Sequence, residues 1–226
     1  MSARAPAVRL AAASIVTMLG IVSLPRPAAA QAANAGRVEL SGGAVFVGGF
    51  DEGDRAAQLT SNSGGTFDQF STSAKVDPVV GVQARLGVYL TRALAIEGGV
   101  RWTRPVFEVR ISGDSEGAPD TTAEETMNHY LIDGSAVLHF GDRSTSRAVP
   151  FVYGGAGYLR ELHEGDALVE EGTEFHGGGG VKIWMGASRR VGARLEAGLS
   201  LRDGGFDVEE KRRTVPVAGG FIFWVF

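Results

Sequence analysis

Four histidines are the side chains of this sequence best suited to acid–base or metal chemistry: His129, His139, His163 and His176. A serine hydrolase would need one of them within hydrogen-bonding reach of a serine. Ser135 and His139 stand four positions apart on one expected strand, about 13 Å in an extended chain, which is too far for a direct hydrogen bond. The chain has no cysteine, and it has neither an HExxH nor a His-x-His spacing. We therefore expect no catalytic residue, no cofactor and no metal site.

A second set of chemically capable side chains consists of eight charged residues at the polar positions of alternating apolar–polar stretches: Glu39, Arg85, Glu97, Arg101, Asp133, Lys182, Arg194 and Glu196. Four acids balance four bases. Partly buried charges must be paired, because each unpaired one costs several kcal/mol. The set therefore predicts an interior salt-bridge network, in which either Arg85 or Arg101 pairs with Glu97 across a short hairpin.

The elements that must position these charges have a period of two residues. From Val80 to Leu90, every second residue is apolar, and glycine or polar residues stand between them. The same alternation predicts eight strands, at residues 37–50, 78–90, 94–111, 125–141, 149–162, 173–186, 190–202 and 214–226. The apolar phase flips after Trp102, and Pro105 there predicts a β-bulge or the exit of the strand from the membrane. Residues 149–159 are apolar on both faces, so their orientation stays open.

The connections between these strands alternate in length. Residues 91–93, 142–148 and 187–189 are short turns, whereas 51–77, 112–124, 163–172 and 203–213 are long loops that carry most of the acids. Short turns at one end and long loops at the other are typical of an outer-membrane barrel. The acidic loops suit divalent cations and lipopolysaccharide-bound ions better than anions. A formal net charge of −4 gives no support to nucleic-acid binding.

The first 30 residues have the layout of a secretory signal peptide. Arg4 and Arg9 precede a mostly apolar run from Leu10 to Leu24, and small residues lead to Ala30. The run is shorter than the about 20 residues that a spanning helix needs, so a membrane anchor is the weaker alternative. We expect cleavage after Ala30, or after Ala32, and a mature barrel domain of residues 31–226.

The last strand ends the chain on alternating apolar residues, Ile222, Trp224 and Phe226. A terminal Phe in this setting resembles the sorting signal that the barrel-assembly machinery reads during insertion. The stretches PFVYGGAGY, HGGGGVKIWMG and RRVGARLEAGL also resemble strands of the small eight-stranded outer-membrane β-barrels of the OmpA and OmpX type. The resemblance implies an all-β protein, an eight-stranded antiparallel up-and-down transmembrane β-barrel after a cleaved signal peptide.

This fold implies a monomeric, non-enzymatic protein of the bacterial outer membrane, in contact with outer-membrane lipid and lipopolysaccharide. An eight-stranded barrel is just wide enough for side chains to fill its interior. We therefore expect a plugged lumen, in which Lys182 and Arg194 share Glu196, and a structural, surface-interaction or very-small-solute role. An extracellular ligand would be held by the long loops. The alternatives are a barrel enzyme acting on lipid A or phospholipid, and a soluble lipocalin-like ligand-binding barrel.

Overall fold

The computed structural model describes residues 35–60, 64–141, 145–162, 169–204 and 212–226. The expected signal peptide, its cleavage site at Ala30, and His163 lie outside the described residues. No helix in the described part of the chain is long and apolar enough to cross a membrane.

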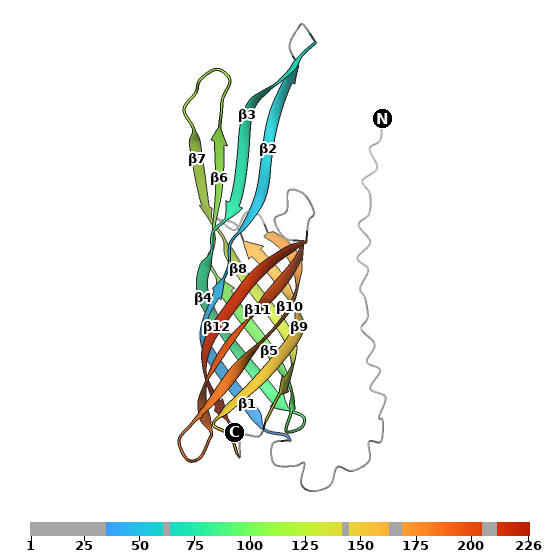
Figure 1. The fold of residues 1–226 in the computed structure, drawn as a ribbon, viewed down its shortest axis with the longest axis vertical. Helices are drawn as coiled ribbons and strands as arrows, with labels where there is room; N and C mark the ends of the chain where they lie inside the picture. Colours follow the sequence, from blue (N-terminus) through green and yellow to red (C-terminus); the bar gives the residue numbers. More distant parts are fainter. Residues whose placement is uncertain (1–34, 61–63, 142–144, 163–168, 205–211) are drawn as a thin grey trace, which may run out of the picture.

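Eight strands form a closed antiparallel barrel, as the alternation predicts (Figure 1). In order around the barrel they are β1 (Val38–Val47), β4 (Val79–Tyr89), β5 (Leu94–Thr103), β8 (Asn128–His139), β9 (Ala148–Leu162), β10 (Val169–Met185), β11 (Val191–Gly204) and β12 (Arg213–Val225). β12 pairs with β1 and closes the barrel. The shortest of these strands has 10 residues, and a tilted membrane strand needs about 9–11.

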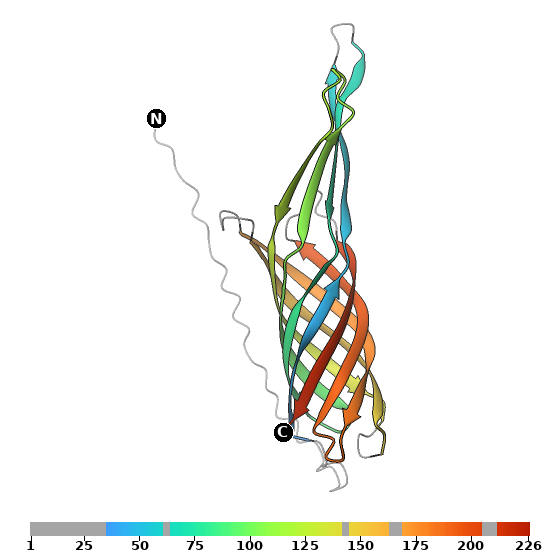
Figure 2. The ribbon, with the colours of Figure 1, turned by 90° about the vertical axis from the view of Figure 1, so that its left-hand side faces the viewer.

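Four further strands form a second sheet that projects beyond one end of the barrel (Figures 1 and 2). They are β2 (Phe50–Thr60), β3 (Thr66–Val76), β6 (Val106–Ser112) and β7 (Thr121–Thr126), in the order β2-β3-β6-β7. We call this sheet the extension. The prediction that 51–77 is a loop is wrong, because most of its residues pair in this sheet, and the predicted loop 112–124 is shorter than expected, because its two ends pair there as well. Their side chains are largely polar on both faces, so the apolar alternation that marks a membrane strand is missing.

The flip in apolar phase after Trp102 marks the boundary between the two sheets. β5 ends at Thr103 and β6 begins at Val106, so the expected strand 94–111 is two strands. Pro105 lies in the gap, where it has no amide hydrogen to give to a ladder. Its carbonyl accepts a hydrogen bond from the Met127 amide, at 3.0 Å. The chain therefore leaves the barrel at Pro105.

The exterior of the barrel is apolar and its interior is polar. Val80 is 67% exposed and Ile132 is 61% exposed on the outside, whereas Lys182 and Arg194 are completely buried inside. This distribution of apolar and polar side chains is the reverse of that in a water-soluble protein, and it suits a barrel that spans a membrane. The structure also settles residues 149–159: Phe151 and Tyr153 face inward, and Tyr158 faces outward.

Candidate functional site

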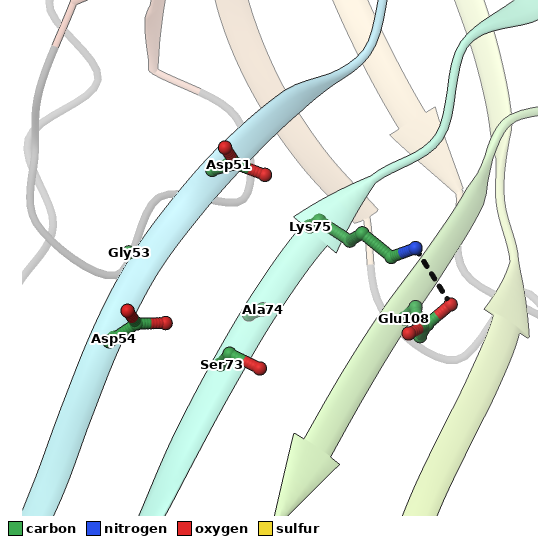
Figure 3. A pocket seen from close by; sticks show the side chains of 7 residues that line it. All are labelled: Asp51, Gly53, Asp54, Ser73, Ala74, Lys75 and Glu108. Atoms are coloured by element: carbon green, nitrogen blue, oxygen red, sulfur yellow. Dashed lines mark ion pairs between the residues drawn. The ribbon is translucent and has the colours of Figure 1, made fainter.

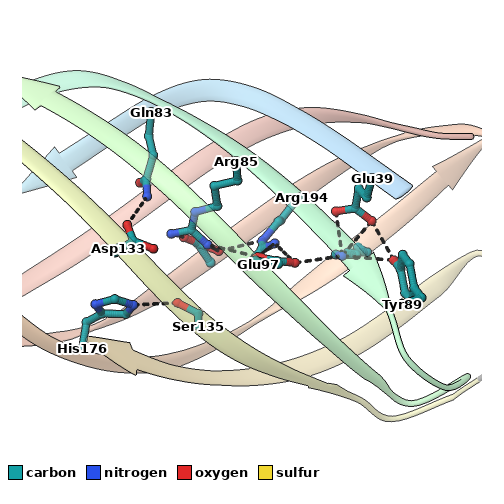
Figure 4. A network of polar contacts seen from close by, with 11 residues as sticks. Glu39, Gln83, Arg85, Tyr89, Glu97, Asp133, Ser135, His176 and Arg194 are labelled. Carbon is teal, nitrogen blue, oxygen red and sulfur yellow. Dashed lines mark hydrogen bonds and ion pairs between the residues drawn. The ribbon is translucent and has the colours of Figure 1, made fainter. Parts of the chain in front are cut away.

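Most of the charged residues of the lumen meet in one network of ion pairs and hydrogen bonds, and the part of it nearest the short turns is built around Glu39 (Figure 4). The Lys182 ammonium lies 2.8 and 2.9 Å from the two carboxylate oxygens of Glu39. The Tyr89 hydroxyl donates to the same carboxylate at 2.6 Å and accepts from Lys182 at 3.2 Å. Glu39 on β1, Tyr89 on β4 and Lys182 on β10 thus tie three strands together across the lumen.

Arg194 is the centre of the network. Its Nη1 lies 2.7 and 2.8 Å from the Glu97 carboxylate oxygens, and its Nε lies 2.7 Å from Glu196. Arg85 approaches the same two acids, at 2.9 Å from Glu196 and 3.6 Å from Glu97. The expected pairing of Lys182 with Glu196 is replaced by contacts with Glu39 and, at 3.6 Å, with Glu97.

The register explains why the acids are needed at this level. Lys182 on β10 stands directly opposite Arg194 on β11, and like charges in that position repel each other. Glu97 lies within 4 Å of both cations, so one carboxylate from β5 offsets the repulsion. Side chains from opposite walls of the barrel therefore fix each other's position.

A second group of ion pairs, nearer the extension, uses two residues that sequence reasoning missed. Arg101 donates to both oxygens of Glu174, at 2.5 and 2.6 Å, and Arg202 lies 3.3 Å from the same carboxylate. Glu174 and Arg202 stand at the ends of the strands expected at 173–186 and 190–202, next to the long loops. The period-two alternation could have revealed them. Glu174 lies an even number of residues from the inward Lys182 on the same strand, and Arg202 lies an even number from the inward Arg194.

Asp133 is the one predicted network residue that makes no ion pair among the described residues. Its carboxylate lies 3.5 Å from the Gln83 amide. When that amide is turned, the Gln83 oxygen accepts from Arg85 Nε at 2.9 Å. The two contacts need opposite orientations of the amide, so Gln83 either donates to Asp133 or accepts from Arg85. The other seven predicted residues all lie in ion pairs.

Ser135 and His176 form a contact that was also missed. The Ser135 hydroxyl lies 2.7 Å from His176 Nε2, although β9 runs between their strands. Gly155 on β9 is the register partner of both. A Cβ at Gly155 would lie 2.6 Å from the Ser135 hydroxyl and 2.8 Å from His176 Nε2. The feature that permits this contact is an inward glycine on the middle strand, with an inward polar residue opposite it on each neighbouring strand.

The space beside this pair is too small for a substrate. The lumen cavity lined by His176, Asp133 and Tyr153 has a volume of about 10 Å³, which is room for about one water molecule. A serine and a histidine at this distance have the geometry of a nucleophile and its base. A cavity of this size does not hold an ester or amide next to His176.

An aromatic cluster fills the barrel below the charges, toward the short turns. It includes Tyr89, Phe151, Trp184 and Phe223. Trp184 and Phe223 meet edge to face, with their centroids 4.7 Å apart, and the Arg194 guanidinium lies 4.5 Å from the Phe151 ring centroid. Cations over ring faces gain further attraction when they are shielded from water.

The remaining described histidines, His129 and His139, are buried inside the barrel. His139 stacks on Tyr89 at 5.3 Å, and its Nδ1 lies 3.2 Å from the Ala93 carbonyl. His129 lies 3.2 Å from the Glu161 carboxylate. Within the described ranges, no group of three or more histidine, aspartate or glutamate side chains is arranged to hold a metal ion.

The extension is clamped to the barrel at its base. A register shift between Asp51 and Gly53, where Gly53 has φ 95°, interrupts the β2 ladder at Glu52. Glu52 is buried and pairs with Arg213 of β12. Arg213 also donates to the Asp51 carbonyl at 2.6 Å and lies 5.2 Å from the Phe50 ring centroid. One arginine thus holds the start of β2 to the barrel wall.

One face of the extension base is charged and hollowed. Asp51, Asp54, Lys75 and Glu108 are among the residues that line a cavity of about 280 Å³ (Figure 3). Lys75 lies 3.1 Å from Glu108 and 3.4 Å from Asp77. The hydrogen bond to Glu108, followed by the charge of Asp77, raises the pKa of Lys75 above its ordinary value.

The outward residues of the last strand lie at the barrel end opposite the extension (Figure 1). Ile222, Trp224 and Phe226 are all exposed. The Phe226 amide donates to the Val38 carbonyl at 2.9 Å, so the final residue is still held against the start of β1.

Comparison with known proteins identifies the fold. No protein-family profile and no curated protein sequence matches the chain. The solved structure of the outer membrane protein OprG from Pseudomonas aeruginosa is 11% identical, with a TM-score of 0.54 over 85% of this chain and 97% of OprG. Neisserial surface protein A is 13% identical, with a TM-score of 0.48 over 84% of this chain and 99% of its own. The closed eight-stranded barrel and the likeness to OprG show that the chain has the fold of the small eight-stranded outer-membrane β-barrels.

Proposed function

We propose that this protein resides in the bacterial outer membrane, has a closed lumen, and acts through the extension, which makes contacts outside the cell. The observation that carries the proposal is the sheet β2-β3-β6-β7, which projects beyond one end of the barrel (Figure 2). Long strands beyond the membrane are not needed to close a barrel. They supply a large surface that is presented away from the lipid.

The filled lumen supports a surface role over a general pore. Glu39, Lys182, Glu97 and Arg194 connect the walls of the barrel in its middle, and the aromatic cluster fills it below. The cavity beside Asp133 holds about one water molecule. A path for hydrated solutes would require these ion pairs to separate inside a low-dielectric interior, which costs several kcal/mol for each ion.

The exterior supports a membrane location over a soluble ligand-binding barrel. Apolar side chains such as Leu86 and Leu199 are more than half exposed along the barrel, and a contiguous apolar surface of this kind would cause a soluble protein to aggregate. We further propose that Ile222, Trp224 and Phe226 are read by the barrel-assembly machinery during insertion, and that lipopolysaccharide surrounds the end that carries the extension.

Two single cysteines test the location and orientation, because the chain has no cysteine of its own. Ser115 is exposed at the extension, and Ser188 is exposed at a short turn on the other end. A membrane-impermeant maleimide should label Ser115→Cys on intact cells and Ser188→Cys only after lysis. Equal labelling of both on intact cells, or the reverse pattern, would refute the proposed orientation.

Trimming the extension tests the surface role. Replacing residues 54–73 and 109–123 with short turns removes most of the second sheet and leaves every barrel strand intact. Cells that display the trimmed protein should lose adhesion or serum resistance relative to cells that display the full chain. A mobility difference between unboiled and boiled samples confirms that the trimmed barrel is folded. Unchanged adhesion and serum resistance with a folded barrel would contradict the proposal.

A further inference from the structure

A groove with a volume of about 560 Å³ lies on the outer wall of the barrel, between β8 and β9, near the end that carries the extension. It is lined by Tyr130, Ile132, Tyr158, Arg160 and Leu162. The side chains of Tyr130, Ile132 and Tyr158 are between 39% and 61% exposed, so the groove opens toward lipid and not toward the lumen.

The groove lies at the height where a membrane barrel meets the headgroup region. Tyr130 is the direct register partner of Trp102, and both rings are exposed on the outer wall. Outward tryptophan and tyrosine side chains gather at the boundary between lipid and water. The upper part of the groove is therefore at headgroup level, and the lower part is at acyl-chain level.

Arg160 is the charged group of this groove, and it has no hydrogen-bond or ion-pair partner among the described residues. Its acidic neighbour in the register is Glu171. Glu171 accepts a hydrogen bond from the Tyr158 hydroxyl instead. An outward guanidinium with five free donors favours a planar or tetrahedral oxyanion, and phosphate is the one that lipids carry.

Below the tyrosines, the next outward residues on the same two strands are all small, and we call this part of the wall the trough. Gly134 pairs with Ala156, and Ala136 pairs with Gly154, on the same two strands. A Cβ at Gly134 would meet no atom within 4 Å. Inward glycines differ, since a Cβ at Gly155 would lie 2.2 Å from a backbone carbonyl. Packing within the barrel does not require a glycine at 134, and no side chain larger than alanine stands at these four positions of the outer wall.

We propose that this groove and trough hold one molecule of a phosphorylated, multiply acylated glycolipid of the lipid A class. Its phosphate contacts the Arg160 guanidinium, and one acyl chain lies in the trough formed by Gly134, Ala136, Gly154 and Ala156. The assignment to lipid A rests on the proposed function, because the groove lies at the end of the barrel that carries the extension and is placed in the outer leaflet. A phospholipid offers the same phosphate, so the test compares the two.

Native mass spectrometry of the purified full-length protein measures lipid retention, with bisphosphorylated lipid A as the probe. We expect Arg160→Gln to weaken retention by about tenfold, which is the loss of one charge-assisted contact. Enzymatic removal of the phosphates from lipid A should have the same effect on the wild type and little further effect on the variant. Gly134→Leu fills the trough and should weaken retention of both phosphorylated and dephosphorylated lipid A. If Gly134→Leu does not fold, Ala156→Leu serves as the variant that fills the trough.

Two matched controls separate the site from the general surface. Arg147→Gln removes an exposed arginine at the opposite end of the barrel, and Ala197→Leu adds a leucine to the outer wall at β11, away from β8 and β9. Both should bind lipid A like the wild type. Wild-type retention by Arg160→Gln would refute the site, and an equal, Arg160-dependent affinity for phosphatidylglycerol would refute the assignment to lipid A. If either of these results occurs while the two cysteine variants are labelled as proposed above, the lipid site or its assignment is refuted but the proposed location in the outer membrane is not.

Discussion

Replacing Arg194 with methionine tests whether the lumen network holds the barrel together. Arg194 is completely buried, and its guanidinium contacts Glu97 and Glu196 at 2.7 Å. Removing one partner of a buried ion pair usually costs about 3–5 kcal/mol, because a charge is left uncompensated. Arg85 still approaches both acids after the change. We therefore expect a loss near the lower end, about 3 kcal/mol in the free energy of unfolding.

Urea unfolding in lipid vesicles, followed by tryptophan fluorescence, measures this loss. With a slope of about 2 kcal/mol per molar urea, the midpoint should fall by about 1.5 M. Arg160→Met is the matched control, because Arg160 is exposed and outside the network, and it should change stability by less than about 0.5 kcal/mol. Adding Glu97→Gln to Arg194→Met should recover part of the loss, since it removes one stranded charge. An unchanged midpoint for Arg194→Met, or strictly additive losses in the double variant, would refute the reasoning.

Three further predictions concern the barrel wall, the base of the extension and the extension itself. Gly155→Ala should lower the free energy of unfolding by about 1–3 kcal/mol, because its Cβ would lie 2.2 Å from the Gly134 carbonyl oxygen. In the same urea assay, Gly134→Ala should leave stability unchanged. Equal effects of the two substitutions would contradict the close packing at Gly155. Arg213→Ala should release the base of the extension, seen as faster tryptic cleavage there with an unchanged barrel gel shift; unchanged cleavage would argue against the clamp. The hydrogen bond from Arg110 lowers the pKa of Asp120 below its ordinary value of 3.8, so this pair stabilises the extension above that value and is lost as the pH falls through the lowered pKa. NMR titration should show the Asp120 midpoint rising in Arg110→Gln, and an unmoved midpoint would exclude the pair.

The barrel was predictable from the sequence because a membrane strand repeats every two residues. That period places Glu39, Arg85 and Lys182 inward without any knowledge of their partners. Which charges meet depends on the tilt and stagger of the strands around the barrel, and a sequence does not state these. Lys182 therefore contacts Glu39 on a strand that is not its neighbour, although the local pattern favoured Glu196.

The extension was not predictable in the same way. β2 and β3 are solvated on both faces, so their stability comes from backbone pairing and not from an apolar period. Pro105 was the informative residue, because it marked the point where the phase changes and the chain leaves the barrel. Glu174 shows the remaining limit: its parity was correct for the lumen, but its position near an acidic loop concealed it.

The central claim is that the charge network and the aromatic cluster close the lumen, and conductance across a planar lipid bilayer tests it most directly. The wild-type protein, inserted at low concentration, should show no large, stable current steps, because the ion pairs around Arg194 and the rings around Trp184 fill the barrel. Large and stable single-channel steps from the wild-type protein would contradict the account.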